Sequence, residues 1–291
     1  MPTADEARPV LVGGHESGNG ADLVGLVRLL PGAVTVGPGR PLHDQVAARL
    51  ADGDGPVVVV PMTWGRDPRL VAEAARTLHW LARHEGHGRL ALSPPFGTAD
   101  HLVATLRRAV NQTTTRHPGA AVVLAAPRAD PFDDAELHRV AHLVRTHGAG
   151  SEVSVACVAR PTDLDDAVRR ARLLGAEEVV VVPAAFTVPD PAVVAAAGAQ
   201  SFGPLMSDPA AARIVQERVT AAVHLLEHEQ DGIGEGLLAD HDHGYAHSHA
   251  TDADGAGHTH GAAGAIGHTH RHPHTHLHEV RTDGELESRH A

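Results

Sequence analysis

The feature that most constrains the fold is a run of four valines followed by proline, which occurs twice in the chain. Residues 57–60 precede Pro61, and residues 179–182 precede Pro183. An uninterrupted β-branched run that stops at proline is typical of a short strand buried on both faces. Such strands occur in parallel sheets that helices cover on both sides. The run therefore predicts an α/β fold.

Apolar runs alternate with segments of helical pattern throughout the first half of the chain. The expected strands are residues 10–13, 34–36, 57–60 and 89–93, and the expected helices are about 22–30, 41–52, 68–83 and 98–110. This alternation predicts a parallel four-stranded sheet with helices on both faces.

The second half repeats this plan with a period of about 120 residues. The segment GRPLHDQVAARLADGDGPVVVVPMT, residues 39–63, aligns with ARPTDLDDAVRRARLLGAEEVVVVPAAFT, residues 159–187. Strands are expected at 121–125, 153–158 and 179–182, and helices at 135–146 and 162–174. A period of this length indicates a duplicated domain, because solenoid repeats are much shorter.

The composition changes twice along the chain. The polar segment TTTRHPG, residues 113–119, is typical of a domain boundary. Residues 230–291 are rich in glycine, alanine, aspartate, threonine and histidine and contain few large apolar side chains, so we expect a disordered tail. The predicted organisation is therefore two tandem flavodoxin-like domains, residues 8–113 and 119–229, followed by that tail.

Charge and composition exclude several classes of partner. The net charge is −12, and no stripe of basic residues interleaved with aromatics is visible, so nucleic acid is not an expected partner. No apolar run reaches the ~18 residues of a membrane span, so no membrane partner is expected. The single cysteine fits a reducing compartment, and the N-terminus lacks the pattern of a signal peptide. We therefore expect a cytoplasmic protein.

Histidine is the outlier of the composition, and most of the C-terminal histidines occur as His-x-His. Twelve fall between residues 241 and 278 of the predicted tail, at His241, His243, His247, His249, His258, His260, His268, His270, His272, His274, His276 and His278. Imidazole suits Zn²⁺, Ni²⁺, Co²⁺ and Cu²⁺. The pattern predicts that the tail binds divalent transition metals, and the alternative is a solvated segment without a role.

A further histidine, His15, follows the first predicted strand directly, in VLVGGHES. The carboxyl edge of a parallel sheet is where open α/β folds bind ligands. His15 is therefore a candidate ligand-binding residue, although a loop histidine without a ligand fits the same position.

The motif GGHES resembles the Gly-His-Gly-Ser motif of the sirohydrochlorin cobaltochelatase and ferrochelatase family. The segments RPLHDQVAARL, VVVVPM and LALSPPFGTADHLVATLRRAV are also similar to that family, and FGPLMSDPAAARIVQERV looks like a second copy of the last one. The likeness spans about residues 9–226. It implies two chelatase-like domains, with His15 as metal ligand and proton acceptor and Ser17 at the position of the motif serine.

The resemblance further implies a metal chelatase of the lyase class, which inserts Co²⁺ into sirohydrochlorin for cobalamin biosynthesis. Ni²⁺, Fe²⁺ or Zn²⁺ are alternative substrates, and no organic cofactor is expected. Arg66 and Arg69 are candidates to bind the carboxylates of the tetrapyrrole, because guanidinium pairs with carboxylate in a bidentate manner. Glu16 is a candidate to orient His15 or to take a proton. Either a monomer or a homodimer fits two fused repeats.

The family usually carries a second histidine after the valine strand. The corresponding segment, PMTWGRDPRLV, has Arg69 or a neighbour at that place. His101 is a possible substitute, although helix capping by Thr98 or Asp100 explains its segment equally well. The alternative function is therefore a catalytically degenerate chelatase paralogue that stores or delivers metal.

Overall fold

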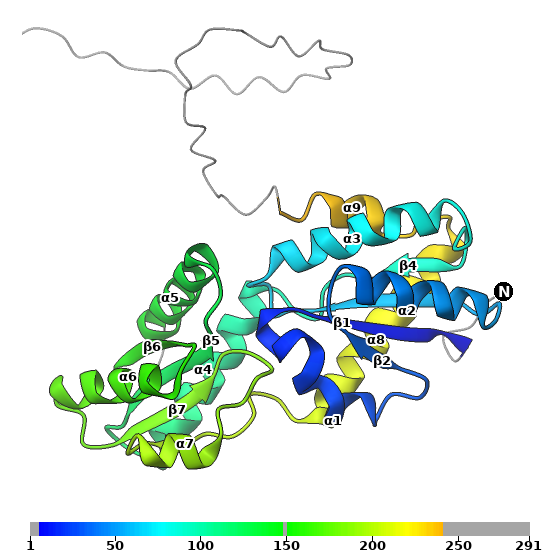
Figure 1. The fold of residues 1–291 in the computed structure, drawn as a ribbon. Coiled ribbons are helices and arrows are strands. Elements are labelled where there is room, and N and C mark those ends of the chain that lie inside the picture. The colour runs from blue at the N-terminus through cyan, green and yellow to red at the C-terminus, as the bar shows by residue number, and fades with distance from the viewer. Residues whose placement is uncertain (1–5, 148–149, 241–291) are drawn as a thin grey trace, which may run out of the picture. The chain divides into compact units, whose positions relative to one another are not determined.

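The computed structural model describes residues 6–147 and 150–240. These residues form two four-stranded parallel sheets with helices on both faces of each (Figure 1). The predicted α/β class and the predicted duplication are confirmed, since both sheets have the same strand order. The predicted tail histidines lie outside the described residues.

The first sheet has the strand order β2-β1-β3-β4. Its strands are β1 (Arg8–Gly13), β2 (Val34–Val36), β3 (Val57–Met62) and β4 (Leu90–Leu92). The helices of this half are η2 (His15–Leu23), α1 (Val24–Val27), α2 (Arg40–Ala51), α3 (Pro68–Ala82) and α4 (Ala99–Arg116). The helix predicted over 22–30 thus begins earlier, as the 3₁₀ segment η2, and α1 ends at Val27.

The second sheet has the equivalent order β6-β5-β7-β8. Its strands are β5 (Ala121–Pro127), β6 (Val153–Val158), β7 (Val179–Pro183) and β8 (Gln200–Ser201). The remaining helices are α5 (Pro131–Thr146), α6 (Pro161–Leu173), α7 (Pro191–Ala196), α8 (Asp208–Glu227) and α9 (Ile233–Leu237). We call the two sheets with their flanking helices the first and second lobes.

The valine runs form the central strands, as their composition predicts. In β3, Val57 and Val59 belong to the core beneath α2 and α3, whereas Val58 and Val60 belong to the core on the other face. All four side chains are fully buried. Because successive side chains of a strand point to opposite faces, only a strand covered on both sides needs an unbroken apolar run.

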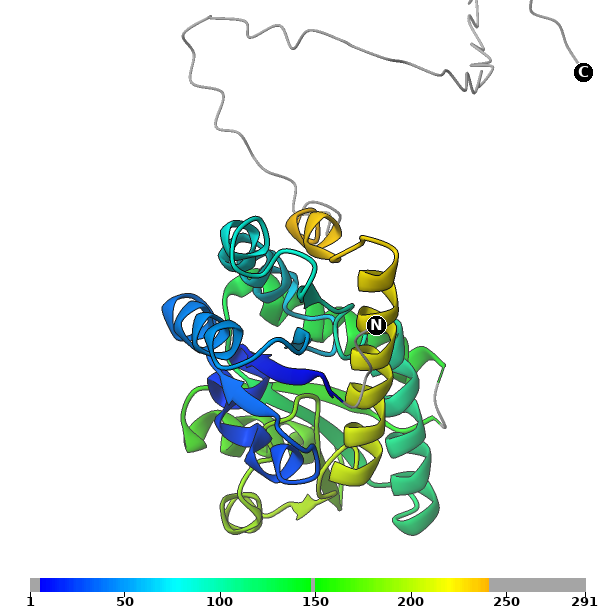
Figure 2. The same cartoon turned by 90° about the vertical axis from the view of Figure 1, so that its right-hand side faces the viewer.

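The two halves exchange a helix. Helix α4 follows β4 in sequence but contacts α5 and β7 of the second lobe, and α8 follows the second sheet but contacts α1, β3 and β4 of the first. Figure 2 shows α8 on one side of the first sheet, with α2 and α3 on the other. Both exchanged helices contribute to one apolar core that includes residues of both sheets. The segment η2, which follows β1, contacts β5 of the second lobe directly.

Residues 230–240 differ from the prediction of a disordered tail. They include α9, which lies beside α3 in Figure 1. Leu92 N donates to Asp231 O over 2.8 Å, and the side chain of Ile233 is buried in the core beneath α3. The helix was not predicted because the sequence DGIGEGLL, residues 231–238, is rich in glycine and has no helical pattern of apolar residues. Ile233 is its one buried large apolar side chain. Within the described residues, no helix is long and apolar enough to cross a membrane.

Candidate metal centre

His15 follows β1 at the carboxyl edge of the first sheet. The preceding residue, Gly14, has no side chain, and this allows the carboxylate of Asp67 to approach the backbone, because a Cβ on Gly14 would lie 2.2 Å from Asp67 Oδ2. A side chain at position 14 would therefore displace that carboxylate. The side chain of His15 is 18% exposed, and its Nε2 has no hydrogen-bond partner among the described residues.

Asp67 comes from the loop between β3 and α3, where it caps the helix. One carboxylate oxygen, Oδ1, accepts from Leu70 N over 3.0 Å, and the other, Oδ2, lies 3.0 Å from His15 Nδ1. An N-cap aspartate satisfies a backbone donor that the first helical turn leaves free. Here the same side chain also fixes the orientation of the imidazole.

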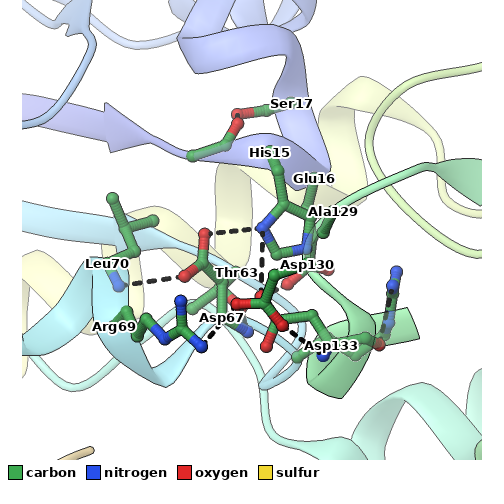
Figure 3. A network of polar contacts seen from close by, with 12 residues as sticks. His15, Glu16, Ser17, Thr63, Asp67, Arg69, Leu70, Ala129, Asp130 and Asp133 are labelled. Carbon is green, nitrogen blue, oxygen red and sulfur yellow. Dashed lines mark hydrogen bonds and ion pairs between the residues drawn. The ribbon is translucent and has the colours of Figure 1, made fainter. Parts of the chain in front are cut away.

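Asp133 reaches the centre from the other lobe. It lies in the first turn of α5, is 4% exposed, and has Oδ2 4.0 Å from His15 Nδ1. Figure 3 shows both carboxylates directed toward the imidazole. Each of the three side chains offers a ligand atom, and these atoms lie within 4.8 Å of one another. Among the described residues, this is the one such group of three or more potential metal ligands.

The charges at the centre support one another. Burial lowers the pKa of His15, but the hydrogen bond and the charge of Asp67 outweigh it, so the pKa is raised overall. Burial alone would raise the pKa of the Asp67 carboxyl, yet the hydrogen bond and the charge of His15 keep that pKa below its ordinary value. Without a metal ion, an imidazolium paired with a carboxylate is thus favoured.

Glu16 lies behind His15 and is fully buried. Its carboxylate accepts from Thr63 Oγ1 and, over 3.2 Å, from Trp64 N. Burial raises the pKa of Glu16, while the charge of Arg66 acts against that rise. The backbone oxygen of Glu16 accepts from Phe186 N at 2.9 Å, which joins the two lobes. The predicted candidate for orienting His15 is therefore placed to hold the loop rather than the imidazole itself.

Both arginines predicted to bind substrate have internal partners. Arg66 is 1% exposed, and its guanidinium points at two carbonyl oxygens of the second lobe, Ala184 O and Asp133 O, each at 3.4 Å. Arg69 forms an ion pair with Asp130, the N-cap residue of α5. In this conformation Arg66 connects the lobes and has no surface on which to contact a substrate carboxylate.

Two further candidates have local roles. Ser17 is fully buried, and its hydroxyl donates to Gly14 O at 3.3 Å, so it closes the turn after β1. The ring of His101 contacts the backbone N of Thr98 at 3.3 Å and forms a capping box at the start of α4. The capping interpretation of His101 therefore describes the structure, and His101 is not part of the His15 centre.

The two carboxylates of the centre were not among the residues expected from the sequence. Asp67 lies in PMTWGRDPRLV, the segment where a second histidine was sought, and the pair Asp-Pro there indicates a helix start. Asp133 is 118 residues from His15 (133 minus 15) and follows a strand of the other repeat. The position of Asp67 just after the valine strand is a local signal for this carboxylate, whereas Asp133 lies inside the first turn of a helix of the other repeat.

Comparisons with known proteins give a fold likeness only. The chain matches no protein-family profile and no curated protein. Among solved structures it is similar to a sirohydrochlorin chelatase from Bacillus subtilis subspecies spizizenii in complex with cobalt, at 16% identity and a TM-score of 0.44, over 79% of this chain and 99% of that one.

It is also similar to a solute-binding protein of an ABC transporter system from Conexibacter woesei, at 12% identity and a TM-score of 0.41, over 79% of this chain and 81% of that one. A substrate-binding protein of an ABC transporter from Desulfitobacterium hafniense, in complex with Leu, is similar at 12% identity and a TM-score of 0.37. The match covers 80% of this chain and 87% of that one. At these values the chain is not assigned to either class of protein.

Proposed function

We propose that the protein is a tetrapyrrole metal chelatase that inserts Co²⁺, or a similar divalent ion, into sirohydrochlorin. The observation that carries the proposal is the cluster of His15, Asp67 and Asp133 at the carboxyl edge of the sheets. The resemblance of GGHES to the chelatase motif gives His15 the role of ligand and proton acceptor.

The chemistry of insertion suits these three side chains. A divalent ion enters the macrocycle as two pyrrole protons leave, so the site must hold the ion loosely and accept protons. A neutral imidazole with two carboxylates has a net charge of −2, which matches a divalent ion. The mixed nitrogen and oxygen donors suit Co²⁺, Ni²⁺, Fe²⁺ and Zn²⁺ better than Mg²⁺ or Ca²⁺, which prefer oxygen alone.

The cluster allows two modes of binding. An ion that replaces the Nδ1 proton would contact His15 and both carboxylates. Alternatively, Nδ1–H donates to Asp67, and the lone pair of Nε2 binds the ion, as in the carboxylate–histidine pairs of many metal sites. The second mode agrees with the unpartnered Nε2.

Absorption spectroscopy of sirohydrochlorin with Co²⁺ tests the function. We expect the wild type to accelerate the band shift of insertion, and His15→Ala and Asp133→Asn each to remove at least about a hundredfold of that acceleration. Glu136→Gln is the matched control, because it neutralises a carboxylate of the same helix that pairs with Arg139 at the surface. A wild type no faster than the uncatalysed reaction contradicts the proposal.

A second candidate is a metal-delivery or storage protein without insertion activity. One observation favours it: Arg66 is buried, so the guanidinium expected to bind substrate carboxylates has no exposed surface for them. In that case the wild type binds Co²⁺ through His15 and Asp133 and releases it to an acceptor chelator, while insertion stays at the uncatalysed rate. The tail histidines, which are outside the described residues, would serve either function as a tethered metal reservoir.

A further inference from the structure

Strand β6 is the longest of the described strands that lie at the outer edges of the two sheets. The other three, β2, β4 and β8, contain only two or three residues each. The edge of β4 is also covered, because Leu92 N donates to Asp231 O beyond it. Strand β6 has six residues, VSVACV, without a charge or a proline. Most natural edge strands are shortened, charged or interrupted by proline, which prevents pairing with another strand. Strand β6 lacks these protections.

The outer edge of β6 offers free backbone groups at Val153 and Val155. In the parallel ladder with β5, Arg128 N donates to Val158 O, so the even-numbered residues of β6 face β5. The amides and carbonyls of the odd-numbered residues therefore point away from the sheet. Those of Val153 and Val155 have no hydrogen-bond partner among the described residues. Cys157 O, in contrast, accepts from Arg128 Nη2 at 3.2 Å.

The space beside this edge is open between two helices. Helix α5 covers one face of the second sheet and α6 the other, and both contact β6 (Figure 1). A cavity of about 320 Å³ lies over Val153, Ser154 and Val155, and a second one of about 560 Å³ continues along the strand to Cys157. Leu174, which is 75% exposed, lines the first cavity from the end of α6. The edge therefore has room for a further strand and an uncovered apolar side chain beside it.

The charges along this edge favour a second copy of the same chain as the partner. The first cavity has basic side chains in its walls, including Arg145 of α5 and Arg170 of α6. Of the two cavities, only the second has carboxylates among the described residues of its walls, including Asp134 of α5 and Asp166 of α6. Each helix thus begins with an acidic part and ends with a basic one. A two-fold axis across the strand reverses this order in the partner, so that basic ends lie beside acidic beginnings.

We propose that two copies of this chain associate through β6, with the two strands antiparallel about a two-fold axis at Ser154. In this register, Val153 of each copy exchanges backbone hydrogen bonds with Val155 of the other. The hydroxyl of Ser154, which is buried without a partner among the described residues, meets its counterpart at the axis. The two second sheets become one sheet of eight strands, four from each copy. This association is independent of the metal centre and of the proposed function.

Sedimentation equilibrium of the full chain tests the association, with EDTA present so that metal ions cannot bridge tail histidines. We expect a reversible equilibrium between monomer and dimer, and Val155→Pro should weaken the dimer at least about tenfold, because each copy loses an interstrand hydrogen bond. The proline removes an outward N–H and leaves the bonds to β5 intact, which an edge strand tolerates. Val155→Ala, the matched control, shortens the same side chain but keeps the N–H and should weaken the dimer much less.

Three outcomes of this experiment contradict the proposal. A wild type that is monomeric at every concentration overturns it. A dimer that Val155→Pro leaves unchanged also overturns it, because that dimer must use another surface. An equal loss in Val155→Pro and Val155→Ala overturns the pairing of strands, because the backbone N–H would then have no part in the contact.

Disulfide trapping tests the register in a Cys157→Ala background, which removes the one native cysteine. Ser154→Cys places two thiols across the axis in a pair without hydrogen bonds, where the Cα atoms are ~4.5 Å apart and a disulfide fits. We expect a covalent dimer under mild oxidation. Ser201→Cys, on the outer strand β8 of the same sheet, is the matched control and should remain monomeric. If neither variant forms a covalent dimer, or both do so equally, the two-fold axis at Ser154 is wrong.

Discussion

At the scale of single residues, Asp67 links the fold to the site. Its two oxygens have different partners, one the first turn of α3 and the other His15. The helix cap fixes the carboxylate, and the carboxylate fixes the imidazole. Gly14 is part of this arrangement, because any larger residue there would occupy the place of Oδ2. Binding geometry and local helix stability are therefore coupled at this residue.

The pair of His15 and Asp67 should make stability depend on pH in a defined window. The pKa of His15 is raised, so its contribution is complete below its ordinary value of 6.5 and is lost as pH rises through the folded value. The pKa of Asp67 is lowered, so its contribution is complete above 3.8 and is lost as pH falls through the folded value. The pair stabilises most between these limits.

Urea unfolding of wild type and His15→Ala at a series of pH values measures this effect. We expect the difference in free energy of unfolding to be largest between pH 3.8 and 6.5, the ordinary values of the two groups, and to decrease above and below. The pH-dependent part should be about 1–2 kcal/mol, as for a partly buried charged hydrogen bond. His43→Ala, which removes an exposed pair with Asp44, is the control. Its difference in free energy of unfolding should change less with pH than that of His15→Ala. A flat difference would contradict the prediction.

What could be predicted at this scale depended on sequence distance. His15 was found because it directly follows an apolar strand, a signal within a few residues. Asp133 enters the centre only through the docking of α5 of the second lobe against the loop after β1, which no local pattern records. Arg66 was a candidate to bind substrate carboxylates, but its guanidinium is buried against carbonyls 67 and 118 residues away in the sequence.

At the scale of secondary structure, valine runs and helix caps were informative and the glycine-rich end was not. Strands β3 and β7 were predicted within one or two residues, because β-branched runs end at a proline in both. Helix α9 was missed because its stability comes from its contacts with α3 and β4, and not from its own sequence, which contains glycine at every second position from 232 to 236.

Gly232 should be essential for the docking of α9. Its φ is +69°, and a Cβ would lie 2.2 Å from Leu92 O, a backbone atom that cannot move aside. Gly232→Val should therefore release the segment 231–240, exposing Ile233 and costing about 1–3 kcal/mol of stability. Hydrogen exchange measured by mass spectrometry should show faster exchange in 230–240.

Gly234→Ala is the matched control for that substitution. It lies in the same turn, has no atom within 4 Å of the position that a Cβ would take, and should leave exchange unchanged or slow it slightly, because alanine favours helix. Unchanged exchange in Gly232→Val would mean that α9 does not depend on this close approach to β4.

At the scale of the whole molecule, the exchanged helices join the two repeats into one folding unit. Helix α8 buries four large apolar side chains, Val215, Val219, Val223 and Leu226, in the core that includes the first sheet. Their burial corresponds to about 6–12 kcal/mol at ~1.5–3 kcal/mol each. That amount is comparable to the total stability of a typical protein, about 5–15 kcal/mol. The first lobe without α8 should therefore not be stable.

Separate expression of residues 1–119 and 120–291 tests this conclusion. The first fragment lacks α8, and the second lacks α4, which covers β7 and α5. We expect neither fragment alone to show cooperative thermal unfolding by circular dichroism, and an equimolar mixture to regain a single transition. The full chain should unfold in one step, and a chain that ends at residue 240, as the control, should unfold at nearly the same temperature. If either fragment unfolds cooperatively by itself, the duplicated units are independent domains. The metal centre, which takes His15 from one unit and Asp133 from the other, would then depend on docking between the units and not on a shared core.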